Sequence, residues 1–344
     1  MDIIKKIKII AVTGPTATGK TRLGVGLARR FGGEIVSADS RQVYRGLNIG
    51  TGKDLLEYGS GQDAVPYHLI DTQDPHYDYN LMEFQLDATR AILDIHARNK
   101  IPFLVGGSPL YVDSLIRNYR LPGGPPNQEQ RTGFRTKTIP ELLDILMTEN
   151  PDTFETFKDR SNPTRIIRAI EIARYGRTNT DTPGLDAEWL VIGSLFDRKE
   201  IHARIEARLD ARLAEGMLDE ARTLHANGLG WDRFDYFGLE YRYMARHLQD
   251  TITLKERRDS LLAKIRQFAR RQDIWFRKME REGINIYWIK NGDYAEAEQL
   301  AETFLADKPL PDPEIKLNDI RYGPKGDRKP PKQKGKGELT MDNG

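Results

Sequence analysis

Cysteine is absent from the 344 residues of this sequence, and histidine is scarce, with six residues. The absence of cysteine excludes disulfide bonds and cysteine-ligated metal sites. The histidines lie far apart and form no H-x-x-H or H-E-x-x-H motif, so we expect no zinc site. A chain without disulfides is compatible with the cytoplasm, which is the compartment we expect.

Long apolar runs are also missing, because no stretch comes near the length that spans a bilayer. The first residues lack the pattern of a signal peptide, and we expect no membrane association. Charged residues make up 30% of the chain and hydrophobic residues 38%, which is typical of a globular protein with a solvated surface. The length favours about two domains. A net charge of +2 does not by itself indicate a nucleic-acid-binding protein.

The most specific motif is a glycine-rich segment that fits G-x-x-x-x-G-K-[ST]. The apolar run Ile7–Val12 precedes it and a helical pattern follows it, so it connects a predicted strand to a predicted helix. Its glycines let backbone N–H groups converge, Lys20 supplies a cation, and the Thr21 hydroxyl is placed to ligate Mg²⁺. The residues expected to bind a di- or triphosphate are Gly14, Pro15, Thr16, Ala17, Thr18, Gly19, Lys20 and Thr21.

Strands and helices alternate after this loop. The segments Glu34–Ala38 and Pro102–Val105 are predicted strands, with a helix over Leu81–Arg98 between them. This alternation predicts an α/β fold of the P-loop NTPase type, a parallel sheet flanked by helices. Asp39 follows one strand and Gly106–Ser108 follows the other. Both should therefore meet the glycine-rich loop at the carboxyl edge of the sheet, where ligands bind.

The composition divides the chain into three parts. A cluster of proline and glycine at 121–126 predicts a boundary. We expect a catalytic core made of residues 1–122 plus 185–306, with a small helical subdomain inserted at 123–184. From 307 to 344 the chain is rich in proline, glycine and lysine and poor in apolar residues, so we expect a disordered basic tail.

Two long helices are predicted in the second half, over Lys199–Asn227 and Thr253–Glu282. On the first, Arg204 and Arg208 lie four residues apart, so either can clamp a diphosphate or face solvent. On the second, aromatic residues and arginines alternate over 268–277. This pattern suits a nucleic-acid surface, and the same spacing is equally compatible with a buried core face.

Several polar residues are candidates for chemistry. Asp39 can act as a general base, bind Mg²⁺ through water, or simply form a turn. Ser108 offers a hydroxyl at the same edge, or a helix N-cap. Arg165 and Arg168 lie three residues apart on a predicted helix and can contact phosphate. These residues indicate a magnesium–phosphate enzyme, but they do not choose between phosphoryl transfer and displacement of a diphosphate.

As a set, the motifs resemble those of tRNA dimethylallyltransferases, the isopentenyl transferases that act on tRNA. The matching stretches are collinear and cover roughly residues 8–290. They are Gly14–Thr21, Ser37–Tyr44, Ile49–Lys53, His68–Asp71, Val105–Tyr111, Arg165–Glu171 and Arg270–Arg277.

The resemblance implies that dimethylallyl diphosphate binds with its diphosphate on Thr16–Thr21 and Mg²⁺. The acceptor would be the N6 amine of the adenosine 3′-adjacent to the anticodon, flipped out of the tRNA loop. Asp39 matches the general base, while Lys20, Thr21 and Arg208 match groups at the diphosphate. The residues implied in tRNA contact or catalysis at the acceptor are Asp39, Ser40, Arg41, Gln42, Ser108, Arg131, Thr164, Arg165, Ile166, Ile167 and Arg168.

The sequence departs from the family pattern at several positions. Serine stands at Ser108 where the family usually has threonine, and proline stands at Pro109 instead of glycine. Asp54 replaces a proline and Thr164 a glutamine, and Gly238–Arg242 holds two more residues than the family's Gly-Tyr-Arg. Because Ser108 keeps the hydroxyl, these departures concern RNA contacts more than the chemistry.

Three other functions remain open at this point. An adenylate isopentenyltransferase would share the loop and the chemistry of Asp39. A P-loop nucleoside or shikimate-type kinase would share the loop, but we find no arginine-rich lid motif. A non-catalytic RNA-binding protein would have no need of Lys20, Thr21 and Asp39. The helical insertion and the basic aromatic helix favour tRNA as substrate, and we expect the enzyme to act as a monomer.

Overall fold

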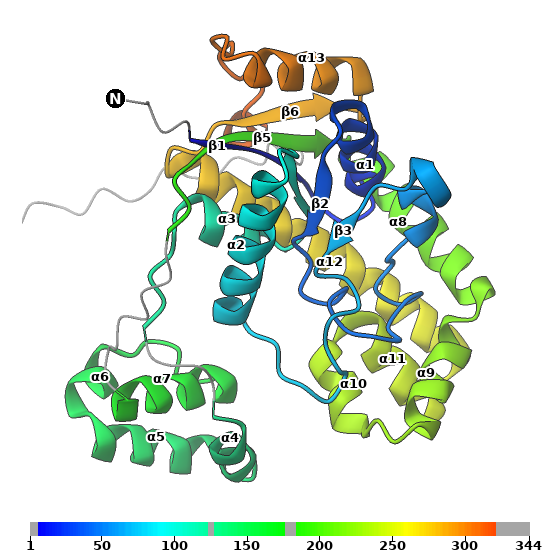
Figure 1. Cartoon of the computed structure of the whole chain (residues 1–344). Helices are drawn as coiled ribbons and strands as arrows, with labels where there is room; N and C mark the ends of the chain where they lie inside the picture. Colours follow the sequence, from blue (N-terminus) through cyan, green and yellow to red (C-terminus); the bar gives the residue numbers. More distant parts are fainter. Residues whose placement is uncertain (1–5, 123–126, 176–183, 321–344) are drawn as a thin grey trace, which may run out of the picture.

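The computed structural model describes residues 6–122, 127–175 and 184–320. Within these ranges, six strands form one parallel sheet in the order β3-β2-β4-β1-β5-β6 (Figure 1). The predicted α/β class with a parallel sheet is therefore confirmed. The strands are β1 (Ile7–Thr13), β2 (Glu34–Ser37), β3 (Tyr67–His68), β4 (Pro102–Gly106), β5 (Ala187–Leu195) and β6 (Ile286–Lys290).

Strand β1 lies inside the sheet between β4 and β5, and nearly all of its side chains are buried. A strand that is covered on both faces is expected to be a continuous apolar run, as this one is. Thr13 at its carboxyl end is in register with Gly106 of β4 and with Gly193 of β5. Ser37 at the end of β2 is in register with Val105 of β4. The loops that follow β1, β2 and β4 therefore leave from the same edge.

Helices α1 (Lys20–Phe31) and α13 (Tyr294–Leu305) cover one face of the sheet, and α2 (Leu81–Ala97), α3 (Pro109–Ile116) and α12 (Leu254–Arg281) cover the other (Figure 1). The alternation of side chains along β1 explains this arrangement. Ile10 and Val12 belong to the core beneath α1 and α13, while Ile9 and Ala11 belong to the core beneath the other three helices.

A group of four helices continues from β5: α8 (Arg198–Glu215), α9 (Met217–Ala226), α10 (Trp231–Phe237) and α11 (Leu239–Leu248). The single helix predicted over Lys199–Asn227 is wrong, because the chain breaks at Gly216 into α8 and α9. Gly216 has φ 109° and ψ 26°, a left-handed conformation that ends one helix and begins the next. The apolar spacing continues across the break, so periodicity alone did not reveal it.

Helices α4 (Gln128–Arg135), α5 (Ile139–Glu149), α6 (Pro151–Thr156) and α7 (Pro163–Tyr175) lie apart from the sheet (Figure 1). They enclose a small core of their own, formed by residues such as Phe134, Leu142, Leu146 and Ile170. We call α4–α7 the helical unit. The apolar spacing of the sequence predicts helices over about Ile139–Thr148 and Thr164–Tyr175, which correspond to α5 and α7, but it does not predict the short α4 and α6. Of the proline-glycine boundary predicted at 121–126, residues 123–126 lie outside the described residues.

The disordered tail expected from residue 307 is wrong for residues 307–320, which pack against α12 and β6. Leu317 is fully buried, and its backbone N–H donates to Glu280 Oε1 at 2.9 Å. The Tyr287 hydroxyl donates to the carbonyl of Pro311 at 2.9 Å. Asn318 adds hydrogen bonds to Glu280 and to the Arg277 carbonyl, and Ile315 and Ile320 pack against the core, so apolar contacts and hydrogen bonds together hold this segment. Residues 321–344 of the expected tail lie outside the described part of the chain.

In the described part of the chain, none of the helices has both the length and the apolar character needed to cross a bilayer.

Candidate active site

Three loops meet at the carboxyl edge of the sheet, after β1, β2 and β4. The backbone N–H of Ser108 donates to the Ala38 carbonyl at 3.1 Å, and the Ser108 hydroxyl accepts from the N–H of Ser40 at 3.1 Å. A Cβ at Gly107 would lie 2.8 Å from Cε of Lys20, so the loop after β4 also approaches the glycine-rich loop closely. The convergence predicted for these segments is confirmed.

The glycine-rich loop has the backbone shape that its sequence implies. Gly14 and Gly19 both have positive φ, and a Cβ at Gly14 would lie 2.9 Å from the backbone oxygen of Ser194. The Thr18 hydroxyl donates to the Pro15 carbonyl at 2.9 Å, which closes the turn. Helix α1 begins at Lys20, so its positive N-terminal end lies at the loop. This arrangement is typical of an anion-binding loop.

Two cationic side chains face each other at this loop. Burial and the neighbouring Arg208 lower the pKa of Lys20 to about 8, although Asp39 and Asp54 act in the opposite direction. Burial and the neighbouring Arg212 lower the pKa of Arg208 to about 10. The Arg208 guanidinium donates to the hydroxyl of Thr16 in the loop. Two cations that lie close enough for one to lower the pKa of the other favour the binding of an anion between them.

Arg204 has a different position from Arg208, four residues later on α8. Its Nε donates to the Ala17 carbonyl at 2.8 Å, and its guanidinium lies over the ring of Phe196, 4.3 Å from the centroid. Arg204 thus supports the outside of the loop, whereas Arg208 is electrostatically coupled to Lys20. The two arginines that the sequence left as equivalent candidates are thereby distinguished.

Asp39 lies at the end of β2 and is half-buried. Its Oδ1 accepts a hydrogen bond from the backbone N–H of Arg41 at 2.9 Å, so it does form the turn that one interpretation of the sequence predicted. Its negative charge also acts on both Lys20 and Arg208, which places it beside the diphosphate candidates. The turn and the site are therefore compatible functions of the same carboxylate.

The residues after Asp39 are engaged with the protein. The amide of Gln42 accepts from the Ser37 hydroxyl at 3.2 Å and donates to the Gly52 carbonyl at 3.0 Å. The guanidinium of Arg41 donates to the Tyr236 carbonyl at 2.9 Å and lies over the Tyr236 ring. These contacts hold both side chains beside the site.

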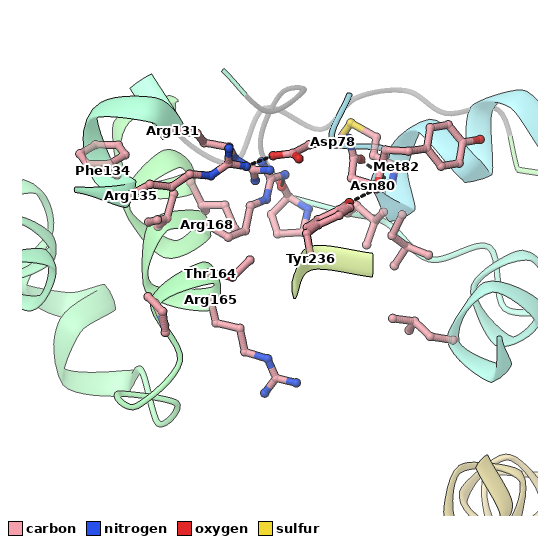
Figure 2. A pocket seen from close by; sticks show the side chains of 18 of the residues that line it. Asp78, Asn80, Met82, Arg131, Phe134, Arg135, Thr164, Arg165, Arg168 and Tyr236 are labelled. Carbon is pink, nitrogen blue, oxygen red and sulfur yellow. Dashed lines mark hydrogen bonds and ion pairs between the residues drawn. The ribbon is translucent and has the colours of Figure 1, made fainter. Parts of the chain in front are cut away.

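A cavity of about 740 Å³ lies between the helical unit and the residues around α2 and α10 (Figure 2). Its wall is rich in arginine, with Arg131 and Arg135 from α4, Arg168 from α7 and Arg233 from α10. The buried carboxylate of Asp78 accepts from Arg233 at 2.5 Å and from Arg135, so it joins the helical unit to α10. The cavity lining contains no residue of the glycine-rich loop.

Most of the predicted tRNA-contacting residues of the helical unit line the cavity, Arg131 and Ile167 among them, and Ile166 does not. Thr164, Arg165 and Arg168 line the cavity, and Figure 2 shows Arg165 extending away from Arg131, Arg135 and Arg168. Arg131 makes two parallel bonds to Glu171, at 2.7 and 3.0 Å.

Ile166 is different, because its side chain is fully buried in the core of the helical unit. Its side chain lies on the inward face of α7, so a tRNA contact at this position would be made by the backbone. Ile167 is 6% exposed and lies at the wall of the cavity.

The aromatic and basic residues of 268–277 belong partly to the core. Phe276 is fully buried against Trp288, whereas Arg270 and Arg271 are exposed. Between these features, Gln272 is 4% exposed and reaches the glycine-rich loop. Sequence reasoning did not single out Gln272. Its only signal was its place within the Arg270–Arg277 motif.

A scan against family models and searches of known proteins bear on this site. A model described as "IPP transferase" matches residues 42–279. This chain belongs to the IPP transferase family. A second model, "Isopentenyl transferase", matches residues 7–60, which include the glycine-rich loop and Asp39.

Relatives of this IPP transferase share much of its sequence. It is 44% identical over 291 residues to tRNA dimethylallyltransferase 1 of Syntrophus aciditrophicus, covering 83% of this chain and 94% of that protein. It is 46% identical over 283 residues to tRNA dimethylallyltransferase 2 of Trichlorobacter lovleyi, covering 82% and 91%.

Solved structures agree with the P-loop fold. The full-length tRNA isopentenylpyrophosphate transferase of Bacillus halodurans superposes with a TM-score of 0.63 at 33% identity, covering 88% of this chain and 98% of that one. A eukaryotic dimethylallyltransferase acting on tRNA shares the fold, with a TM-score of 0.71 at 24% identity over 89% of this chain and 81% of that one.

The glycine-rich loop offers a metal ion one side-chain donor of interest, the Thr21 hydroxyl. Across residues 6–122, 127–175 and 184–320, no group of three or more His, Cys, Asp or Glu side chains is arranged to hold a metal ion. A metal at the loop would therefore depend on the Thr21 hydroxyl and on oxygen atoms of a bound phosphate. Mg²⁺ is commonly bound in this way, with few protein ligands and the rest from phosphate and water.

Proposed function

We propose that this chain transfers a dimethylallyl group from dimethylallyl diphosphate to the N6 amine of the adenosine 3′-adjacent to the anticodon in tRNA. The products are N6-(dimethylallyl)adenosine and diphosphate. The observation that carries the proposal is that a carboxylate, Asp39, lies at the same edge of the sheet as two half-buried cations, Lys20 and Arg208, and acts on the pKa of both. The names of the relatives support the same reaction.

In the proposed reaction, the N6 nitrogen attacks the first carbon of the dimethylallyl group while the bond from that carbon to the diphosphate oxygen breaks. Asp39 accepts the proton that leaves the nitrogen, which is the work of a general base. Its Oδ1 is held by the N–H of Arg41 at 2.9 Å, which directs the carboxylate. The hydroxyl of Ser108 holds the next residue, Ser40, and so supports this carboxylate loop.

The departing diphosphate gains negative charge as the bond breaks. Lys20, Arg208 and the positive N-terminal end of α1 supply positive charge where this negative charge develops. When Mg²⁺ is bound, the Thr21 hydroxyl would be its protein ligand, and the ion would neutralise diphosphate oxygens. Because both cations already lie at the loop, little reorganisation is needed during the reaction.

We propose that the core is formed by residues 1–122 and 185–306, and that the inserted segment 123–184 contacts tRNA. Support comes from the arginines that line the cavity between the two, since phosphate contacts of arginine position a nucleic acid. The proposed contacts are Asp39, Ser40, Arg41, Gln42, Ser108, Arg131, Thr164, Arg165, Ile166, Ile167 and Arg168. We further propose that the enzyme acts as a monomer on cytoplasmic tRNA.

The test is incubation with dimethylallyl diphosphate, Mg²⁺, unmodified tRNA, AMP and ATP, followed by mass spectrometry of the nucleosides and nucleotides. We expect a prenylated adenosine from tRNA, located beside the anticodon by sequencing of the modified fragment. Prenylated AMP without a tRNA product would instead establish an adenylate isopentenyltransferase. Consumption of ATP with neither prenyl product would establish a kinase and overturn the proposal.

A dependence on pH follows from Lys20. Because its pKa is lowered to about 8, its charged form is lost as the pH rises through that value. We expect kcat/KM for dimethylallyl diphosphate to fall above about pH 8, since kcat/KM reports ionisation in the free enzyme. Arginine stays charged in this range, so the Lys20→Arg variant should lack this decline. A decline of the same size in that variant would assign it to another group.

A further inference from the structure

The amide of Gln272 joins the two loops on which the site is built. Its Oε1 accepts from the backbone N–H of Thr16 at 2.9 Å, and its Nε2 donates to the carbonyl of Gly107 at 2.5 Å. These partners lie 256 and 165 residues away in the chain. One side chain of α12 therefore connects the glycine-rich loop with the loop after β4.

Glutamine fits this position because it carries a donor and an acceptor on one planar group. The side chain is 4% exposed, and Thr16 and Gly107 are buried with it. If Gln272 were replaced by an apolar residue, a backbone donor and a backbone acceptor would lose their partners away from water. Among the hydrogen bonds of the described residues, Gln272 is the partner of both the Thr16 N–H and the Gly107 carbonyl.

The position of Thr16 matters for the chemistry. Its N–H is held by Gln272 and its hydroxyl by Arg208, so the middle of the glycine-rich loop is fixed from two sides. On the other side of the amide, the Cβ position of Gly107 lies 3.1 Å from both Gln272 Nε2 and Lys20 Nζ. Gln272 therefore sets the geometry of the two cations proposed to act on the diphosphate.

We propose that Gln272 is a positioning residue for the diphosphate, acting through Thr16 and Gly107 rather than by contact with tRNA. This inference rests on the proposed prenyl transfer. The flanking residues Arg270 and Arg271 are exposed on the same helix, so α12 presents charge to solvent while it inserts one amide into the site. The expected defect is in the use of the diphosphate donor, with tRNA affinity unchanged.

The test compares Gln272→Met and Gln272→Glu with the wild-type full-length chain. Methionine keeps the volume and removes both hydrogen bonds. We expect kcat to fall and the KM for dimethylallyl diphosphate to rise, lowering kcat/KM about 10- to 100-fold, the scale expected for misplaced catalytic groups. The affinity for Mg²⁺-diphosphate, measured by calorimetry, should fall in parallel, while the KM for tRNA stays at the wild-type value.

Gln272→Glu gives a readout that a purely structural role would not move. An ionised carboxylate would face the Gly107 carbonyl without a donor and would pair with Lys20, so the loss should exceed that of Gln272→Met. A protonated carboxyl regains the donor, and activity relative to wild type should therefore recover as the pH is lowered.

The matched control is Gln267→Glu, the same change at an exposed position on the same helix. Gln267→Glu should keep the wild-type kcat, the wild-type KM for both substrates and the wild-type affinity for Mg²⁺-diphosphate. An unchanged KM for the donor in both Gln272 variants, or a loss confined to the fraction of folded protein, would overturn the inference. Wild-type protein that fails to prenylate tRNA would instead refute the proposed function, so the two failures are distinguishable.

Discussion

Asp39→Asn should transfer the dimethylallyl group to tRNA about 10²- to 10⁴-fold more slowly than the wild-type enzyme, the usual contribution of a general base. Asparagine keeps an oxygen that can accept from the N–H of Arg41, so the turn after β2 is preserved. It cannot accept the proton that leaves the adenine amine. The expected result is a folded protein with normal tRNA affinity and a slow chemical step.

The measurement is a single-turnover rate at saturating tRNA and dimethylallyl diphosphate, together with tRNA binding by filter retention. Asp39→Ala serves as the comparison because it removes the turn bond and the base together. Equal rates in the two variants assign the defect to the lost base. Near wild-type activity in Asp39→Asn, or loss of tRNA binding in it, would recast Asp39 as a structural residue of the turn.

Lys20→Met should lower kcat by about 10²- to 10³-fold, the scale for loss of one group that stabilises developing negative charge. Methionine matches the length of the aliphatic chain and removes the charge. Arg208 remains, so we expect binding of the diphosphate to be weakened but not abolished. The effect on kcat should exceed the effect on tRNA affinity, because Lys20 lies at the diphosphate loop and not at the arginine-lined cavity.

Steady-state kinetics with both substrates, and calorimetry with Mg²⁺-diphosphate, would measure these effects. Arg22→Met is the matched control, since Arg22 is an exposed cation in the first turn of the same helix. It should leave kcat within about twofold of wild type, as expected for a surface substitution. If Lys20→Met and Arg22→Met lowered kcat by the same small factor, Lys20 would have no specific part in stabilising the leaving diphosphate.

Local patterns were enough for much of the fold. The apolar run of β1, the glycine-rich loop and the periodicity of α1 predicted the strand, loop and helix that the structure contains. Helices α4 and α6 escaped prediction because each has eight residues or fewer, too short for a repeating pattern to be recognised. The break at Gly216 escaped because the apolar spacing is the same on both sides of it.

The segment 307–320 shows the limit of composition as a guide. Its polar, proline-containing sequence is typical of disorder. In the structure, however, the Leu317 side chain is buried in the core and its backbone N–H donates to the Glu280 carboxylate. Partners from α12 and β6 decide its structure, and no property of the segment itself indicates them.

The sequence by itself determined which backbone segments end at the carboxyl edge, because strand, loop and helix signals depend on neighbouring residues. It therefore supplied Asp39, Lys20 and Ser108 as candidates for the site. Only the tertiary structure gave Arg204 and Arg208 their different partners in the loop, Ala17 and Thr16, and only it brought Gln272 to Thr16 across 256 residues. Helical spacing specifies a face of a helix, whereas the packing of distant elements decides what that face contacts.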